Sequence, residues 1–365
     1  MTVDIAKPLL DEQEILEVTR VINSGMLASG PETSKFEIEF ADFVGSKYAC
    51  AVNNGTSAIC LALSAMGISP GDEVITTPMT FVATANSILS CGAIPVFADV
   101  EESTFNLSPS AVEDAITEKT KAILPVHLYG LPADMESLRS IAEVNDIALI
   151  GDAAQAHGAK LGEKMVGTLG DVECFSFYPT KNMTTGEGGM LTTNQEEIFQ
   201  RIVSIRNHGR INNQMGTYEH EGFGLNLRTT DIASAIGRVQ LKKLPSFNSV
   251  RERNAKLLTS LLSEIDDVEL PSEPPNSTHA WHQYTIRVKD RMSLREYLAS
   301  NGIGSGIYYP RLIQDYPHLN KFKSSCPIAE RIVSEVISLP VHAGLSEEDV
   351  VSVADCILLW SSKNV

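Results

Sequence analysis

The chain of 365 residues is too long for one small core, so two domains are the first expectation. Its 43% hydrophobic and 21% charged residues are ordinary values for a globular protein. The 46 acidic and 29 basic residues give a net charge of −17, which argues against general nucleic-acid binding because phosphates would be repelled. An anionic substrate must therefore meet individually placed basic side chains or backbone amides.

The spacing of the cysteines and the N-terminal residues argue against a metal-binding, secreted or membrane protein. The six cysteines are scattered, with no CxxC pair and no His/Cys cluster at zinc spacing, so we expect no metal site and a reducing compartment. The opening residues MTVDIAKPLLDEQE carry early acids and no long apolar run, unlike a signal peptide. No window approaches the roughly 18 apolar residues of a membrane helix. We expect a soluble, cytoplasmic protein with neither membrane nor nucleic-acid partners.

From residue 48 to about 193, short apolar strands alternate with helical stretches. The expected strands are AVN (51–53), EVITT (73–77), IPVFADV (94–100), KAILPVHL (121–128) and IALIGD (147–152). The expected helices between them are 57–66, 82–90 and 135–145. Strands separated by helices of this length predict βαβ units, a mainly parallel sheet and right-handed crossovers.

The pattern changes around Pro245. A polar helical stretch at 248–265 leads into a proline-rich segment, a strand at 281–288, a helix at 293–300 and a final helix at 347–359. We therefore predict a large domain over 1–245 and a smaller α+β domain over 246–365. Residues 1–20 are a candidate segment to pack on the small domain.

The segment from Asp152 to Gly189 carries the chemistry. Asp152 ends an apolar run, and Lys181 follows a second one and precedes a glycine-rich stretch without helical period. Taken alone, the lysine would be a solvated charge and the acid a helix cap. Ligands of open α/β sheets bind at the carboxyl ends of strands. A lysine that forms a Schiff base, with an acid facing a ring nitrogen, is the signature of a pyridoxal phosphate (PLP) site.

At this point the chain resembles the DegT/DnrJ/EryC1/StrS aminotransferases, which act mainly on nucleotide-linked sugars. The matching segments are NNGTSA (53–58), GDEVITTPMTFVATANSI (71–88), GAIPVFADV (92–100), TKAILPVHLYGLPADM (120–135), DAAQAHGA (152–159), GDVECFSFYPTKNMTTGEGG (170–189), GLNLR (224–228) and AIGRVQL (235–241). The resemblance implies fold type I of PLP-dependent transferases, an aspartate aminotransferase-like α/β fold. One departure is Gly151, where the family commonly has Glu.

The resemblance also implies cofactor contacts. Those it places on the phosphate are Gly55, Thr56, Ser57 and Ser176. A strand-to-helix turn favours phosphate binding at the first three, although Thr56 or Ser57 would otherwise simply cap the helix. Phe81 matches the ring that stacks on the cofactor, and Gln155 the residue that bonds its phenolic oxygen. His157 is interpreted as structural, with orientation of Asp152 as the alternative.

In the family, the GLNLR segment reaches the cofactor phosphate of a neighbouring subunit. The resemblance therefore implies a homodimer with Asn226 contributed by the partner, while Arg228 would otherwise form an internal salt bridge. Tyr309 and Arg311 are the remaining substrate candidates, together with Arg228. The histidines of HAWH (279–282) are rejected as metal ligands, because three-residue spacing in a strand sends them to opposite faces.

The resulting hypothesis is a transaminase that uses PLP and pyridoxamine phosphate. By resemblance it moves an amino group from L-glutamate to a nucleotide-linked 4-keto or 3-keto (6-deoxy)hexose, and Lys181 transfers the proton. The amino sugar would serve glycan, surface polysaccharide or secondary-metabolite synthesis. A cyclitol ketone as acceptor, another PLP reaction and a non-catalytic binding protein stay open as alternatives. A nicotinamide enzyme is disfavoured because no GxGxxG opens a helix after a strand.

Overall fold

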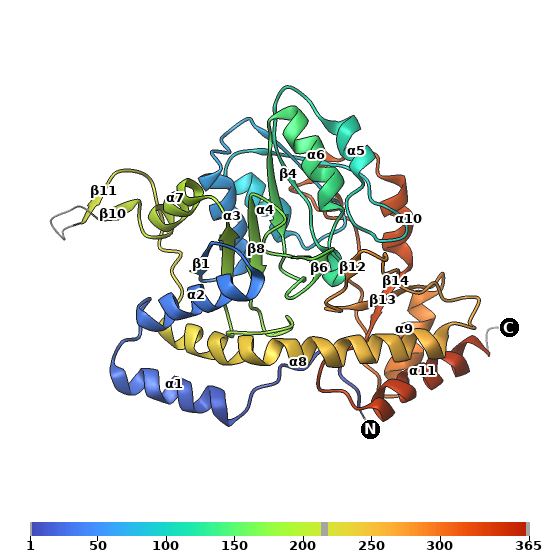
Figure 1. The fold of residues 1–365 in the computed structure, drawn as a ribbon. Helices are drawn as coiled ribbons and strands as arrows, with labels where there is room; N and C mark the ends of the chain where they lie inside the picture. The colour runs from blue at the N-terminus through green and yellow to red at the C-terminus, as the bar shows by residue number, and fades with distance from the viewer. Residues whose placement is uncertain (1, 213–217, 363–365) are drawn as a thin grey trace.

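A computed structural model describes residues 2–212 and 218–362. Its centre is a seven-stranded sheet (Figure 1). The strands in spatial order are β1 (Tyr48–Val52), β9 (Gly189–Thr193), β8 (Val172–Ser176), β5 (Ala148–Asp152), β4 (Thr120–Leu124), β2 (Glu73–Thr76) and β3 (Ile94–Phe97). Only β9 runs antiparallel to its neighbours β1 and β8, so the predicted mainly parallel sheet is confirmed.

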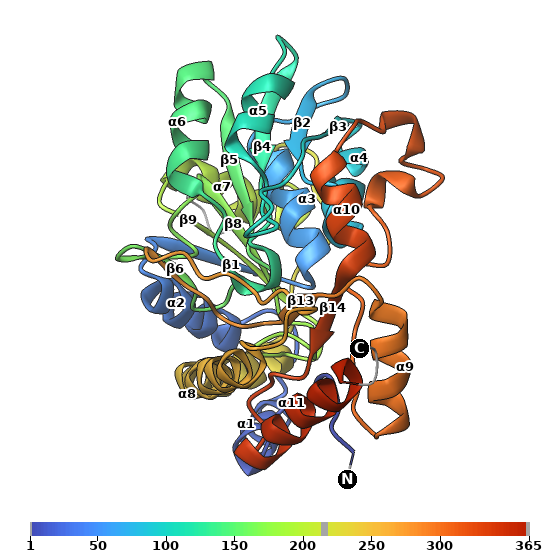
Figure 2. The same cartoon turned by 90° about the vertical axis from the view of Figure 1, so that its right-hand side faces the viewer.

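Helices cover both faces of this sheet. Figure 2 shows α6 and α3 on opposite sides of it. The helices of this part are α1 (Glu12–Ser24), α2 (Pro31–Val44), α3 (Gly55–Ala65), α4 (Ala83–Ser90), α5 (Pro109–Ala115), α6 (Met135–Asn145) and α7 (Glu196–Arg206). Neighbouring strand residues alternate between two buried apolar clusters: Val74, Leu124 and Ile150 in one, and Ile75, Ile123 and Leu149 in the other. This two-sided burial explains why the strands are continuous apolar runs.

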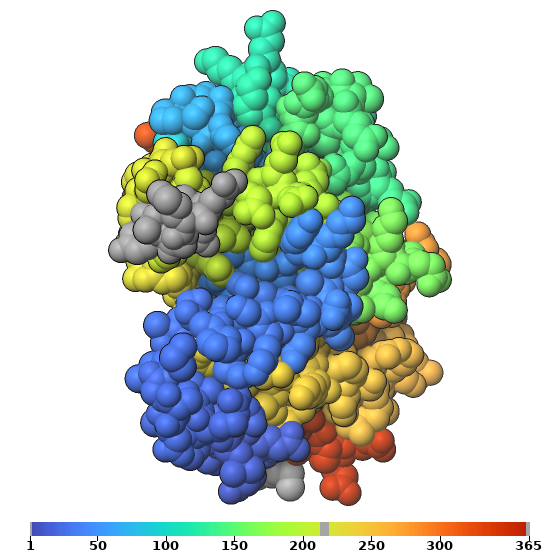
Figure 3. Space-filling view, turned by 60° about the vertical axis from the view of Figure 1, so that its left-hand side comes forward, coloured from blue at the N-terminus to red at the C-terminus, as the bar shows by residue number. Residues whose placement is uncertain are grey.

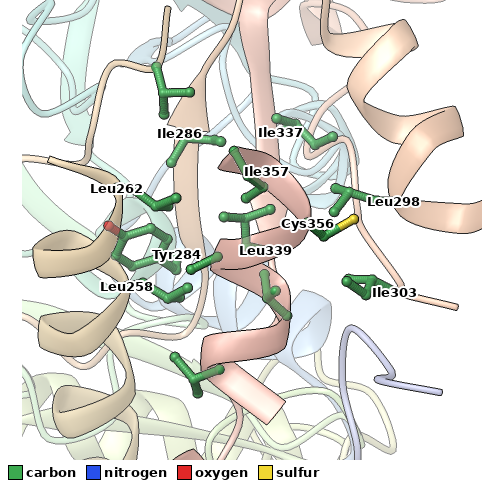
Figure 4. Close-up of a cluster of buried hydrophobic side chains, with 14 of the residues drawn as sticks. Leu258, Leu262, Tyr284, Ile286, Leu298, Ile303, Ile337, Leu339, Cys356 and Ile357 are labelled. Atoms are coloured by element: carbon green, nitrogen blue, oxygen red, sulfur yellow. The ribbon is translucent and has the colours of Figure 1, made fainter. Parts of the chain in front are cut away.

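The C-terminal part forms a separate apolar core. The strands β13 (Tyr284–Arg287) and β14 (Val336–Leu339) pair antiparallel, and α11 (Glu347–Ser361) packs beside α9 (Arg291–Ser300). Side chains from β13, β14, α11 and α8 (Asp231–Leu262) meet in this core (Figure 4). Near the N-terminus, Val3 forms an isolated parallel bridge with Ile303 and is buried in the same cluster.

Short elements complete the chain. They are the 3-10 turns η1 (Leu128–Gly130), η2 (Ile313–Asp315) and η3 (Asn320–Phe322), the helix α10 (Pro327–Glu335), and the strands β6 (Lys160–Leu161), β7 (Lys164–Met165), β10 (Arg210–Asn212), β11 (Tyr218–His220) and β12 (Ser277–Thr278). No described helix has the length and apolar character that a bilayer crossing requires.

Two local expectations were wrong. The helix expected at 248–265 begins at Asp231, where Thr230 caps it by accepting a hydrogen bond from the Ala233 amide, and Pro245 lies inside it. The predicted boundary between residues 245 and 246 therefore falls within one helix, and the two-domain division stays a prediction. The strand expected from residue 281 begins only at Tyr284, so HAWH lies outside it, with Trp281 at a φ of 49°.

Candidate active site

A cavity of about 540 Å³ opens at the carboxyl ends of the central strands. Its walls come from the start of α3, the loop after β2, the ends of β5 and β8, and two C-terminal segments around residues 282 and 308. The residues predicted from the sequence that line it are Gly55, Thr56, Phe81, Asp152, Gln155, Ser176, Lys181 and Tyr309. A cavity of this size accommodates a cofactor together with part of a substrate.

Lys181 lies on the loop that follows β8, as expected. Its backbone amide donates to the Tyr178 carbonyl at 2.9 Å. Burial lowers the pKa of Lys181 to about 8, and the charge of Asp152 opposes that shift. Within 2–212 and 218–362, no group accepts a hydrogen bond from the side-chain amine. The amine is therefore easier to deprotonate than a surface lysine and is available for reaction.

Asp152 ends β5 and is 5% exposed, with its carboxylate at the cavity. Burial raises its pKa, while hydrogen bonds from the Thr84 hydroxyl (2.9 Å) and the Ala154 amide (3.2 Å) and the charge of Lys181 act in the opposite direction. Thr84 in turn is 3.0 Å from the Thr80 hydroxyl. Since a carboxylate can only accept, Thr84 donates to Asp152 and receives from Thr80. The hydrogen bonds from Thr84 and Ala154 therefore fix the orientation of the carboxylate.

The start of α3 forms an anion-binding cradle. Asn54 caps the helix by accepting from the Ser57 amide at 2.8 Å, which is the role that the sequence left open for Thr56 or Ser57. Among the described residues, the amides of Gly55 and Thr56 have no acceptor. A Cβ on Gly55 would lie 2.7 Å from that of Ser176, so only glycine lets the helix approach this hydroxyl. Two amides and a hydroxyl therefore converge where a phosphate would bind.

The opposite wall carries an amide and two rings. Gln155 accepts from the Tyr129 amide at 2.8 Å, which turns its Nε2 toward the Tyr309 hydroxyl at 3.2 Å. The ring centroids of Phe81 and Tyr309 are 6.2 Å apart, and Phe81 is 57% exposed. Phe81 therefore is no core residue, and its ring is free to lie against a planar ligand.

Other predicted residues lie away from the cavity. Ser57 is not among its lining residues, and Arg311 is exposed with its guanidinium 5.5 Å from the Tyr316 ring centroid. Asn226 is exposed, and Arg228 donates to the Asn207 side chain, a hydrogen bond and not the internal salt bridge considered above.

Of the two roles considered for His157, the structure favours the structural one. Both ring nitrogens of His157 lack a partner in the described structure, so it does not orient Asp152, and burial lowers its pKa to about 3. Its ring lies between those of Phe175 and Phe177. No group of three or more potential metal-binding side chains is found among the described residues.

Sequence reasoning missed several lining residues, among them Thr84, Glu187, His282 and Gln283. Thr84 lies in the matching segment 71–88, and its spacing of four residues from Thr80, which precedes α4, was the available signal. His282 was considered only as a metal ligand in a strand. Its position outside the strand lets it face the cavity.

Comparison with known proteins identifies the family. The model of the DegT/DnrJ/EryC1/StrS aminotransferase family matches residues 8–358. The chain belongs to this family. It is 38% identical to the spore coat polysaccharide biosynthesis protein SpsC of Bacillus subtilis, over 96% of this chain and 95% of that protein. It is 36% identical to the UDP-N-acetyl-3-dehydro-alpha-D-glucosamine 3-aminotransferase of Acidithiobacillus ferrooxidans, over 98% of each.

Among solved structures, the crystal structure of DesV from S. venezuelae matches with a TM-score of 0.92 and 36% identity, over 98% of each chain. The predicted fold and the family resemblance are therefore confirmed. As a member of this family, the protein is a PLP-dependent transaminase. The residues of the cavity fit this cofactor: Lys181 offers an amine for its aldehyde, Asp152 an anion for its ring nitrogen, and the start of α3 a cradle for its phosphate.

Proposed function

We propose that this enzyme transfers the amino group of L-glutamate to a keto sugar carried on a nucleotide, in the cavity that holds Lys181. The observation that carries the proposal is that Lys181, Asp152 and the anion-binding cradle at the start of α3 line the same cavity. Bound PLP supplies an aldehyde that captures amines and a ring that accepts electrons. The names of the two relatives, a polysaccharide biosynthesis protein and a UDP-sugar aminotransferase, support a sugar nucleotide as amino acceptor.

Each cavity residue has a defined task in this proposal. The amine of Lys181, with its pKa lowered to about 8, removes and returns the proton at the reacting carbon near neutral pH. Asp152, held by Thr84, keeps the ring nitrogen protonated by its charge. The Nε2 of Gln155, which faces the Tyr309 hydroxyl, would donate to the phenolic oxygen of the cofactor, and Phe81 would cover one face of its ring. The backbone amides of α3 and Ser176 fix the phosphate.

The acceptor is expected to be a 3-keto or 4-keto (6-deoxy)hexose, and the product an amino sugar for glycan, surface polysaccharide or secondary-metabolite synthesis. With a net charge of −17, the enzyme must neutralise the diphosphate locally. Arg311 is a candidate because it is exposed just beyond Tyr309, and Arg228 a second one. A cytoplasmic location stays a prediction that cell fractionation would test.

We also propose a homodimer in which the segment around Asn226 completes the partner's cavity. Asn226 is exposed and does not line the cavity of its own chain. Figure 3 shows the N-terminal helices beside the segment that follows β11 on one face. Exposed apolar side chains from these parts are Ile15, Leu16, Ile22, Met26, Leu27, Phe223 (80% exposed) and Leu225. Such a concentration of exposed apolar groups is typical of an interface.

The dimer proposal is tested by mixing two inactive variants. Lys181→Ala and Asn226→Ala would each be inactive or nearly so, whereas a mixed dimer contains one cavity in which both residues are intact. Recovery of about a quarter of the wild-type activity on subunit exchange is expected from random pairing in equal amounts. A monomeric wild-type protein with full activity would contradict the proposal.

The transamination itself is tested in two half-reactions. Glutamate added to the PLP-loaded enzyme should change its visible absorption and release 2-oxoglutarate, and a keto sugar nucleotide added next should restore the spectrum and yield an amino sugar. Lys181→Ala should lose both changes, while Lys164→Ala, an exposed lysine of β7, should keep them. A spectrum that glutamate leaves unchanged would contradict the amino donor. Failure of every keto sugar would contradict the acceptor.

A further inference from the structure

His282 stands at the cavity wall without a task in the chemistry described so far. It is 7% exposed and lines the same cavity as Lys181. Its Nδ1 lies 3.3 Å from the Oδ1 of Asn182, which is itself 3% exposed. The direction of the proton in this contact decides what the other ring nitrogen offers to the cavity, because a neutral imidazole has one donor and one acceptor.

A chain of hydrogen bonds fixes that direction. The carbonyl of His157 can only accept, so Asn248 directs its Nδ2 toward it, at 2.8 Å. The Oδ1 of Asn248 then faces Asn182 and accepts from its Nδ2 at 2.9 Å. The same Nδ2 donates to the Ala280 carbonyl at 2.7 Å. A reversed Asn182 would bring its oxygen against that carbonyl, so its Oδ1 must point to the histidine.

The carboxamide oxygen of Asn182 can only accept, so the Nδ1 of His282 carries the hydrogen. Burial lowers the pKa of His282 well below its usual value, and the charges of Lys181 and Arg251 act in the same direction. The ring is therefore neutral, and its Nε2 carries a lone pair. Among the described residues, this nitrogen has no hydrogen-bond partner.

We propose that His282 is a substrate-positioning residue whose Nε2 accepts a hydrogen bond from a ring hydroxyl of the keto sugar. This inference rests on the proposed function. A neutral acceptor complements a hydroxyl, which has a proton to donate. It offers nothing to the two carboxylates of glutamate, which only accept, and the single amino group of glutamate is the group being transferred. His282 therefore favours the sugar half-reaction over the glutamate half-reaction. A ring held neutral by its surroundings is a weak base, so its task is positioning and not proton transfer.

The kinetic test compares His282→Phe with His282→Gln in the PLP-loaded enzyme. The phenylalanine variant should raise the KM for the keto sugar about tenfold or more, because a buried hydroxyl then lacks its acceptor. The visible change and 2-oxoglutarate release with glutamate should stay within about twofold of wild type. The glutamine variant, whose side-chain oxygen can reach the position of Nε2, should recover most of the sugar KM. His318→Gln, an exposed histidine outside the cavity, serves as control.

A second measurement does not depend on the catalytic activity of a variant. Nitrogen-15 NMR of histidine-labelled wild-type protein should show one ring with a protonated Nδ1 and an unprotonated Nε2 that is absent from the spectrum of His282→Gln. A protonated Nε2 would overturn the inference, and so would equal losses in both half-reactions for His282→Phe. If the wild-type enzyme completes the glutamate half-reaction but aminates no keto sugar, the proposed function is refuted. The role of His282 in binding a sugar hydroxyl is then refuted with it.

Discussion

Replacement of Thr84 by valine tests how the enzyme keeps a buried carboxylate charged. Valine has the shape of threonine but lacks the hydroxyl that donates to Asp152 at 2.9 Å. A hydrogen bond to a charged group contributes about 1.5–3 kcal/mol. Because this hydrogen bond lowers the pKa of Asp152, its loss should raise the already raised pKa further.

The sign of the pH dependence follows from this shift. A folded-state pKa above the unfolded value means that the folded protein binds the proton more tightly, so stability falls as pH rises from the unfolded to the folded pKa of Asp152. Above this window Thr84→Val should lose the full 1.5–3 kcal/mol or so. Below it, Asp152 is neutral in both proteins, and the loss should shrink to about 0.5–1.5 kcal/mol, the value of a neutral hydrogen bond.

Urea unfolding of the cofactor-free protein at about pH 8 and at about pH 3.5, below the unfolded pKa of an aspartate, measures both losses. Thr80→Val is the matched control, because the Thr80 hydroxyl lies 3.0 Å from that of Thr84 and is not bonded to Asp152. The control should lose less at the higher pH. The reasoning would be refuted by equal losses in the two variants, or by a loss in Thr84→Val that does not change with pH.

Three further substitutions test other parts of the site and fold. Lys181→Met should stabilise the cofactor-free protein by about 1–3 kcal/mol at pH 7 in urea unfolding, because it removes a buried charge. Burial lowers the pKa of Lys181 to about 8 in the folded protein. The gain should therefore vanish as the pH rises from about 8 to the pKa of an unfolded lysine. Ser176→Ala should weaken PLP binding about tenfold in a fluorescence titration, with unchanged secondary structure by circular dichroism. Asp231→Ala should cost about 2–4 kcal/mol in urea unfolding, because Asp231 accepts from the amides of Gly30 and Thr33 at the start of α2; a loss below about 1 kcal/mol would contradict this capping role.

Much of the fold was predictable because the central strands are apolar on both faces and short helices separate them. The positions of Lys181 and Asp152 followed from the same pattern. Asp152 ends one central strand and Lys181 follows another, so both lie at the carboxyl ends of the strands. The start of α8 was missed because Pro245 was interpreted as a break, although a helix held by packing on both sides of a proline can continue through it.

Residues whose roles depend on distant partners could not be predicted. Thr84 and Asp152 are separated by 68 positions, and Asn182 and His282 by 100. No local pattern encodes such pairs, because either partner alone is an ordinary polar residue. The expected role of Asn226 depends on a second chain, which is why only the family resemblance indicated it.

The helix α8 has a consequence for how the molecule unfolds. Its 32 residues span about 48 Å and run beneath the sheet to α11 (Figure 1). Leu241 and Leu244 belong to a core beside the sheet, and Leu258 and Leu262 to the C-terminal core. If either core unfolded, half of α8 would lose its packing, and the other half of the helix would be destabilised as well. Heat or denaturant should therefore melt both halves of the chain in a single cooperative step, and the C-terminal half should not survive as an independent fragment.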